Sequence, residues 1–103
     1  MRYKEIEKNK EINAYLTKGN ANLGQLGFTD HSQAHCVQVA HQAGKILKRF
    51  GYSEHEIELA KIAGYMHDIG NAINRTHHAE YGALLANELL KDTDMSLEDR
   101  ITV

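Results

Sequence analysis

The sequence predicts an all-α fold, and three observations point that way. Proline is absent, so no residue in the chain is kept out of a helix by a ring or by a missing N–H group. β-branched residues occur only in short runs, and apolar residues recur at the three- and four-residue steps of amphipathic helices. A chain of 103 residues has room for one domain with a modest core, and we expect that domain to span residues 1–103.

The first half of the chain predicts two helices. One is expected over residues 2–18, where a thin apolar stripe runs among charged residues and Gly19 offers a left-handed cap. Residues 20–27 contain small and turn-forming types and are expected to form a loop. Thr29 or Asp30 can cap the next helix, which ends before Gly51 and whose expected core face consists of Val37, Ala40, Ala43, Leu47 and Phe50.

The second half predicts a further helix pair and a short last helix. Ser53 and Glu56 have the spacing of a capping box, and the helix that they open leads towards His67. A loop rich in glycine and asparagine follows, and then a helix over about residues 78–90 whose expected core side carries Tyr81, Leu84, Leu85, Leu89 and Leu90. Ser96 with Asp99 indicates one more cap, and we expect the C-terminal helix to be cut short after it.

Composition narrows the function classes. A formal charge of −2 offers no basic field for a nucleic-acid backbone, so we expect no nucleic-acid partner. The single cysteine, Cys36, cannot form an internal disulfide and is expected to pack as a small apolar side chain. No apolar run approaches the roughly 18 residues of a membrane span, and the charged start lacks the apolar centre of a secretory signal. We therefore expect a cytoplasmic protein that contacts no membrane.

A histidine–aspartate pair carries the strongest functional signal. His67 and Asp68 follow the apolar run of residues 62–66, with His35 upstream and His77 and His78 downstream. An imidazole nitrogen and a carboxylate oxygen at the end of a buried helix can share a cation, and neighbouring helices can supply further imidazoles. The pattern predicts a metal site. His41 and His55 are expected to be surface residues without a function.

Three ordered blocks in residues 28–90, FTDHSQAHCVQVAHQAGKIL, IAGYMHDIGN and HHAEYGALLA, resemble the HD superfamily of metal-dependent phosphohydrolases. The resemblance covers about three-fifths of the chain and implies an HD-type bundle of about five helices. It implies that His35, His67 and Asp68 bind a divalent metal, and that Asp68 and His78 are catalytic. It places His78 near a second metal or the substrate phosphate. The further candidates for this role are His77, Arg75, whose guanidinium can bind two phosphate oxygens, and His31, one helical turn before His35.

The implied substrate is a small phosphorylated molecule, a nucleotide by preference, and the metal could be manganese, iron, magnesium or zinc. Two departures from the family pattern favour an alternative, a non-catalytic metal- or nucleotide-binding regulatory module. Asn71 stands where many relatives have lysine, and the closing aspartate of the family lies on a later helix that this sequence does not reach. A purely structural helical oligomer is a third reading. We expect a homodimer, because exposed helical faces need cover.

Overall fold

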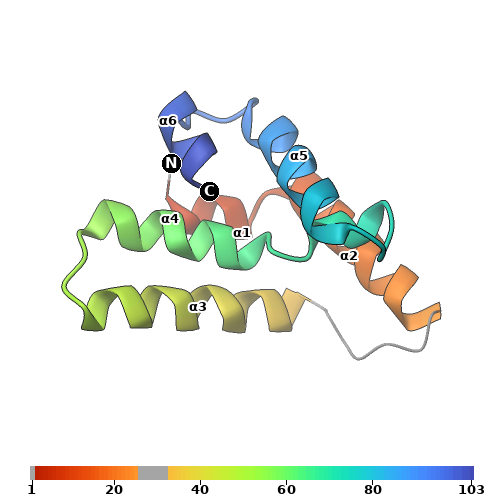
Figure 1. The fold of residues 1–103 in the computed structure, drawn as a ribbon, viewed down its shortest axis with the longest axis horizontal. Helices are drawn as coiled ribbons and strands as arrows, with labels where there is room; N and C mark the ends of the chain where they lie inside the picture. Colours follow the sequence, from red (N-terminus) through yellow and green to blue (C-terminus); the bar gives the residue numbers. More distant parts are fainter. Residues whose placement is uncertain (1, 26–32) are drawn as a thin grey trace.

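The computed structural model describes residues 2–25 and 33–103, and this part of the chain is helical without strands (Figure 1). The elements in order are α1 (Tyr3–Glu7), α2 (Lys10–Gln25), α3 (Gln33–Arg49), α4 (Glu54–Tyr65), the 3₁₀ helix η1 (Ile69–Ala72), α5 (His78–Leu90) and α6 (Leu97–Thr102). The all-α prediction is confirmed, with six α-helices in the described ranges where about five were expected.

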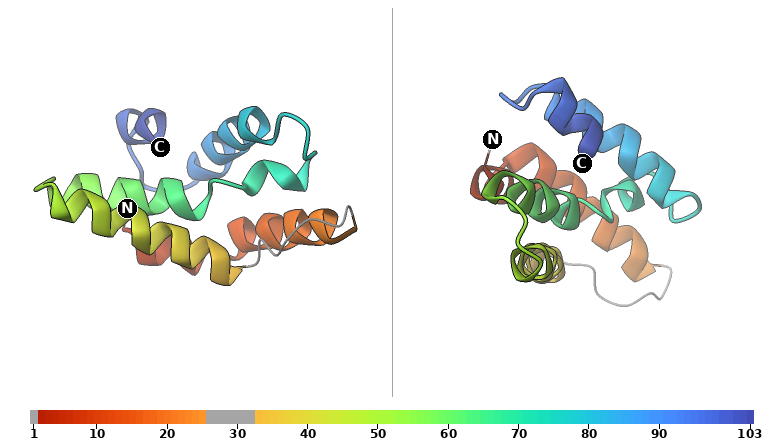
Figure 2. Two further views of the ribbon diagram at one scale, coloured as in Figure 1. Left: turned by 60° about the horizontal axis from the view of Figure 1, so that its bottom comes forward. Right: turned by 60° about the vertical axis from the view of Figure 1, so that its left-hand side comes forward.

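Contacts with neighbouring helices fix the positions of α4 and η1. α3 and α4 lie side by side as a pair, and α1 packs against α4. η1, which follows α4, lies between α2 on one side and α5 on the other (Figure 2). The connection between α4 and η1 therefore lies where helices from both halves of the chain converge.

The N-terminal region differs from the single helix expected over residues 2–18. α1 ends at Glu7, with Lys8 as its C-cap, and α2 begins after Asn9, whose Oδ1 accepts a hydrogen bond from the Ile12 N–H group at 3.0 Å. This asparagine interrupts the helix because it offers the backbone a local side-chain partner. Gly19 does not end a helix, and α2 continues into the expected loop as far as Gln25.

Gly19 instead allows a close helix contact. A Cβ atom there would lie 3.2 Å from both the Ala72 nitrogen and the Asn71 Cβ. The glycine is thus explained by the approach of α2 to η1, which is a tertiary contact that a local cap pattern does not contain.

Most other local predictions are confirmed. Ser53 Oγ accepts from the Glu56 N–H group and Glu56 accepts from the Ser53 N–H group, so the capping box opens α4 as expected. Ser96 caps α6 by accepting from the Asp99 N–H group at 3.1 Å. The bounds of α5 match the expected residues 78–90. The predicted caps Thr29 and Asp30 lie outside the described residues.

The core is formed mainly by side chains from α1, α2, α4, η1 and the end of α5. Its fully buried members include Ile6, Ile12, Ile62, Tyr65, Ile69 and Leu90, and Cys36 is buried among them as predicted. The core prediction is wrong for three residues, because the exposed fractions are 72% for Phe50, 71% for Leu84 and 37% for Tyr81. In α5, Gly82 and Leu89 face η1 and the core. Leu84 is two positions after Gly82, so it points to the opposite side of the helix.

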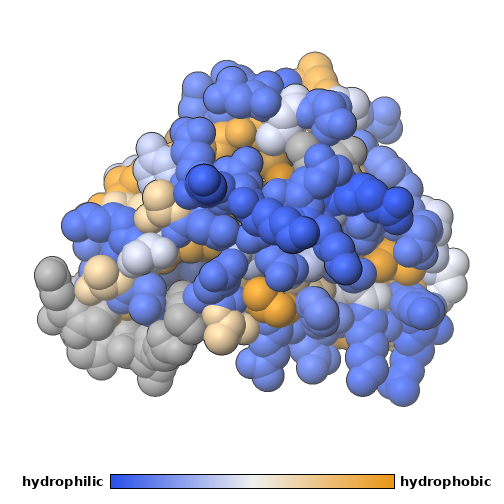
Figure 3. Space-filling model, turned by 180° about the vertical axis from the view of Figure 1, so that it is seen from behind, coloured by the Kyte–Doolittle hydropathy of each residue, from blue (hydrophilic) through white to orange (hydrophobic). Residues whose placement is uncertain are grey.

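The side of the molecule opposite to the view of Figure 1 is largely hydrophilic, with small separate apolar areas (Figure 3). None of the described helices combines the length and the apolar character that crossing a bilayer requires.

Candidate metal centre

His67 and Asp68 lie in the short connection between α4 and η1. α4 ends at Tyr65, with Met66 as its C-cap, so the pair begins one residue beyond the helix. The Asp68 carboxylate is 7% exposed and the His67 ring is 36% exposed. His67 Nδ1 lies 2.7 Å from the Gly64 carbonyl oxygen and donates to it, which leaves Nε2 as the ligand atom. This Nε2 faces Asp68 Oδ2 at 3.0 Å.

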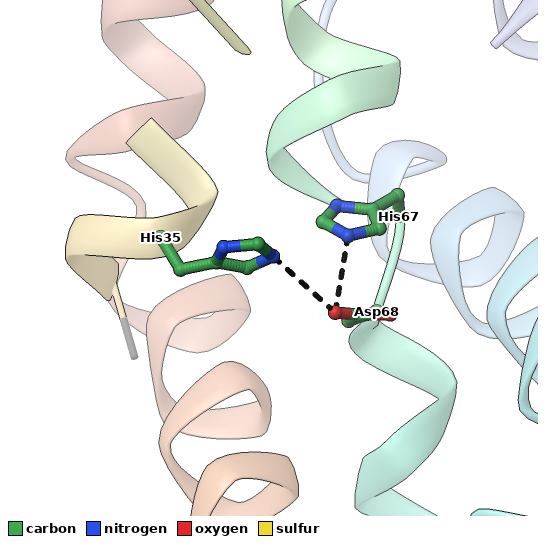
Figure 4. A group of neighbouring side chains, drawn as sticks. All are labelled: His35, His67 and Asp68. Carbon is green, nitrogen blue, oxygen red and sulfur yellow. Dashed lines mark ion pairs between the residues drawn. The ribbon is translucent and has the colours of Figure 1, made fainter. Parts of the chain in front are cut away.

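His35 joins the pair from α3. Its Nε2 lies 3.8 Å from Asp68 Oδ2, and its ring centroid is 5.4 Å from that of His67 (Figure 4). One ligand atom from each of the three residues lies within 4.8 Å of the others. Two ligands bound tetrahedrally to one ion at about 2.1 Å are about 3.4 Å apart, so the three side chains could hold a divalent metal with only small movements.

The charges of the pair are coupled. The hydrogen bond to the Asp68 carboxylate is the largest effect on His67 and raises the pKa of its imidazole, and the Gly64 carbonyl acts in the same direction, while burial opposes both. The space between His67 Nε2 and Asp68 Oδ2 thus favours positive charge, which a proton or a metal ion can supply.

The second carboxylate oxygen of Asp68 faces a different group. His78, the first residue of α5, places Nε2 3.6 Å from Asp68 Oδ1. Its Nδ1 lies 3.2 Å from the Arg75 carbonyl oxygen, and Arg75 Nη1 lies 3.4 Å from its Nε2. Oδ2 of Asp68 therefore faces His35 and His67, whereas Oδ1 faces His78 and the neighbouring Arg75.

A close backbone contact holds α5 at this position. Gly70 is buried in η1, and a Cβ atom there would collide with the His78 carbonyl oxygen and lie 2.6 Å from the Gly82 nitrogen. Only glycine allows η1 and α5 to approach this closely, and the approach is what places His78 beside Asp68.

The other histidines in the described part of the chain lie outside this cluster. His77 is exposed in the left-handed conformation at φ 58°, with Nδ1 3.1 Å from Glu80 Oε2. His31 lies outside the described residues. His55 pairs with Asp99 at 3.0 Å, and His41 meets the Tyr3 ring edge-on.

Asn71, which was expected in a loop, lies in the 3₁₀ helix η1. Asn71 is 1% exposed, and its Oδ1 accepts from Arg75 Nη1 at 3.5 Å. The available signal was its position between the apolar residues Ile69 and Ile73, where a polar side chain is unusual.

Comparison with known proteins agrees with the geometry. Residues 33–102, well over half of the chain, match the model of the HD domain. An uncharacterized protein of Methanocaldococcus jannaschii is 32% identical over 89% of this chain. Ribonuclease Y of Bacillus pumilus is 40% identical, and that of a Staphylococcus epidermidis strain 36% identical, each over 64% of this chain.

The chain spans 41% of the archaeal protein and 14% of each Ribonuclease Y, and so less than half of every one of these relatives. No solved structure matches the chain significantly. The matched residues include His35, His67 and Asp68 of the metal cluster and the helix α5 that begins with His78. The chain therefore belongs to the HD domain family, whose members are generally metal-dependent phosphohydrolases.

Proposed function

We propose that this chain is a metal-dependent phosphohydrolase domain that acts on a small phosphorylated molecule, preferably a nucleotide. The observation that carries the proposal is the convergence of His35, His67 and Asp68 from α3 and the end of α4. Two imidazoles and one carboxylate leave open positions on an ion, as a hydrolytic site requires.

In this proposal His35, His67 and Asp68 hold the ion. A bound divalent ion would lower the pKa of a water molecule and neutralise phosphate charge. The hydrogen bond from Nδ1 of His67 to Gly64 keeps Nε2 directed at the ion, which is the usual task of a second partner on a metal-binding histidine.

Asp68 and His78 are the proposed catalytic groups. Asp68 Oδ1 faces His78 Nε2 at 3.6 Å, so the two can pass a proton between them. Arg75 lies next to His78, and a guanidinium matches two oxygens of a phosphate. His35 and His67 face Oδ2 of Asp68 whereas His78 faces Oδ1, so His78 and Arg75 could contact a phosphate bound next to the ion.

The test combines metal binding with phosphate release. Purified chain should bind Mn²⁺, measured by calorimetry, and release phosphate from at least one member of a panel of nucleoside mono- and triphosphates, cyclic nucleotides and sugar phosphates. His67→Ala should lose both properties. His55→Ala is the matched control, because it removes an imidazole of α4 that pairs with Asp99 and not with Asp68. A folded, metal-loaded chain that releases phosphate from none of these compounds would contradict the proposal.

The same panel separates the other readings. A short RNA belongs in it, since two of the relatives are named Ribonuclease Y, and cleavage of RNA alone would replace the small substrate. Binding of Mn²⁺ and a nucleotide without turnover would favour the regulatory module, which the neutral Asn71 also supports.

We also propose a cytoplasmic homodimer. Leu97, Ile101 and Phe50 expose 62%, 75% and 72% of their surfaces, and a second copy would cover such side chains. Sedimentation velocity tests the homodimer, and a chain that sediments as a monomer at all concentrations would contradict it.

A further inference from the structure

We propose that Asn71 is a positioning residue that holds the Arg75 guanidinium at the candidate site, where Arg75 binds the phosphate of the substrate. The inference rests on the proposed function and adds to it a residue that touches neither metal nor substrate. Its evidence is the way in which Asn71 is held, oriented and left incompletely paired.

The backbone of Asn71 is held on two sides. Its N–H group donates to the Asp68 carbonyl oxygen at 3.0 Å, and its carbonyl oxygen accepts from Asn22 Nδ2 at 3.0 Å. The residue is 1% exposed. Asn71 is therefore fixed relative to both the proposed metal ligand Asp68 and helix α2.

The side-chain amide has one chemically sensible orientation. Oδ1 accepts from Arg75 Nη1 at 3.5 Å, whereas the buried Nδ2 has no partner among the described residues. Turning the amide over would place its NH₂ group against the guanidinium, and two donors would then face each other. The observed orientation thus serves Arg75 and leaves Nδ2 without a partner in the described part of the chain.

A buried, unpaired N–H group lowers stability, and packing alone does not explain it. Leucine has the same branched side-chain skeleton and would occupy this position without an unpaired donor. We infer that asparagine is present for its contact with Arg75 and not for the stability of the fold.

Arg75 connects this contact to the site. Nη1 lies 3.4 Å from His78 Nε2, which can accept because Nδ1 of the same ring donates to the Arg75 carbonyl oxygen. His78 Nε2 in turn lies 3.6 Å from Asp68 Oδ1. The guanidinium is thus held between a buried amide and the proposed catalytic groups, and its planar fork suits a phosphoryl group.

The test uses the whole chain loaded with Mn²⁺ and inorganic phosphate as the probe. Asn71→Leu, Arg75→Gln and the double variant are compared by calorimetric titration with phosphate, by Mn²⁺ titration and by thermal unfolding. Asn87→Leu is the matched control, because Asn87 Oδ1 likewise accepts from an arginine, Arg100, at 3.2 Å, but that pair joins α5 to α6.

We expect Asn71→Leu and Arg75→Gln each to weaken phosphate binding roughly tenfold, the typical effect of losing a hydrogen bond to a charged group. Because Asn71 acts through Arg75, the double variant should bind phosphate no more weakly than Arg75→Gln. Asn71→Leu should keep its affinity for Mn²⁺ and unfold at or above the wild-type temperature. Asn87→Leu should bind phosphate as the wild type does.

Three results would overturn the inference: unchanged phosphate affinity in Asn71→Leu, independent effects in the double variant, or a marked loss of thermal stability in Asn71→Leu. If the wild type binds Mn²⁺ and hydrolyses phosphoesters while Asn71→Leu matches it, the inference alone fails. If the wild type binds no Mn²⁺, the proposed function fails, and phosphate binding to the metal-free chain still tests the Asn71–Arg75 pair. A wild type that binds no phosphate in either form overturns the inference, and phosphate release from the substrate panel then decides the proposed function by itself.

Discussion

Replacing Gly70 by alanine tests whether the contact between η1 and α5 supports the site. The new Cβ would collide with the His78 carbonyl oxygen and lie 2.6 Å from the Gly82 nitrogen. Both are backbone atoms of α5, so no side chain can turn aside to make room. The two elements must separate until these distances reach the 3.4 Å or more of ordinary contacts.

The expected cost follows from this separation. Adding a methyl group to a well-packed interior typically costs about 1–3 kcal/mol, and the backbone collision puts Gly70→Ala at the upper end, about 3 kcal/mol. For a domain of about 100 residues this lowers the melting temperature by roughly 10 °C or more. Since His78 moves with α5, phosphate release should fall as well.

Gly82→Ala is the matched control on the same interface. Its Cβ would lie 3.4 Å from the Gly70 nitrogen, which is an ordinary contact, and alanine is favoured over glycine within a helix by about 1 kcal/mol. It should therefore unfold at or above the wild-type temperature, as followed by circular dichroism. If Gly70→Ala unfolds at the wild-type temperature, the reasoning about this contact is wrong.

Three further predictions concern the ion and the core. Asp68→Asn removes the charge near His35 and His67 and should weaken Mn²⁺ binding by about a hundredfold or more in calorimetry, and an unchanged affinity would exclude Asp68 as a ligand. Free Mn²⁺ at about 100 times its dissociation constant should stabilise the wild type by about 2.7 kcal/mol and leave the melting temperature of His35→Ala unmoved. Burial, the largest effect, raises the pKa of Tyr65 above its ordinary value of 10.0, so the unfolded chain loses this proton first. The contribution of Tyr65 to the free energy of unfolding should then be fully present below pH 10 and should decrease as the pH rises above 10. Denaturant titrations at pH 9 and pH 11 should therefore show a smaller loss of stability between the two pH values in Tyr65→Phe than in the wild type.

Several features could be predicted because they depend on neighbours in the sequence. Ser53 and Glu56 are three residues apart, so each can bond the other's N–H group in the first turn of α4 wherever that helix lies. His67 and Asp68 are adjacent, so their proximity also needs no tertiary contact. The ligand types and the ordered blocks therefore indicated a metal-binding family before any coordinates.

Other features depend on which surfaces meet. Gly19 looks like a helix cap in the sequence, but it lies within α2. A glycine is needed there because η1 approaches α2 closely at this residue. Leu84 belongs to an apolar stripe, yet it is exposed because α5 turns Gly82 towards η1. Periodicity shows that a helix has an apolar face but does not show what that face contacts.

The sequence by itself determined the helical class, most helix ends, and the residue types that can bind a metal, since caps, periodicity and adjacent ligands act over a few residues. Only the tertiary structure decided that His35 reaches Asp68 Oδ2 and His78 reaches Oδ1, and that the buried Asn71 contacts Arg75. These distances depend on how closely α3, α4, η1 and α5 pack against one another, and that packing is a property of the assembled core and not of any one segment.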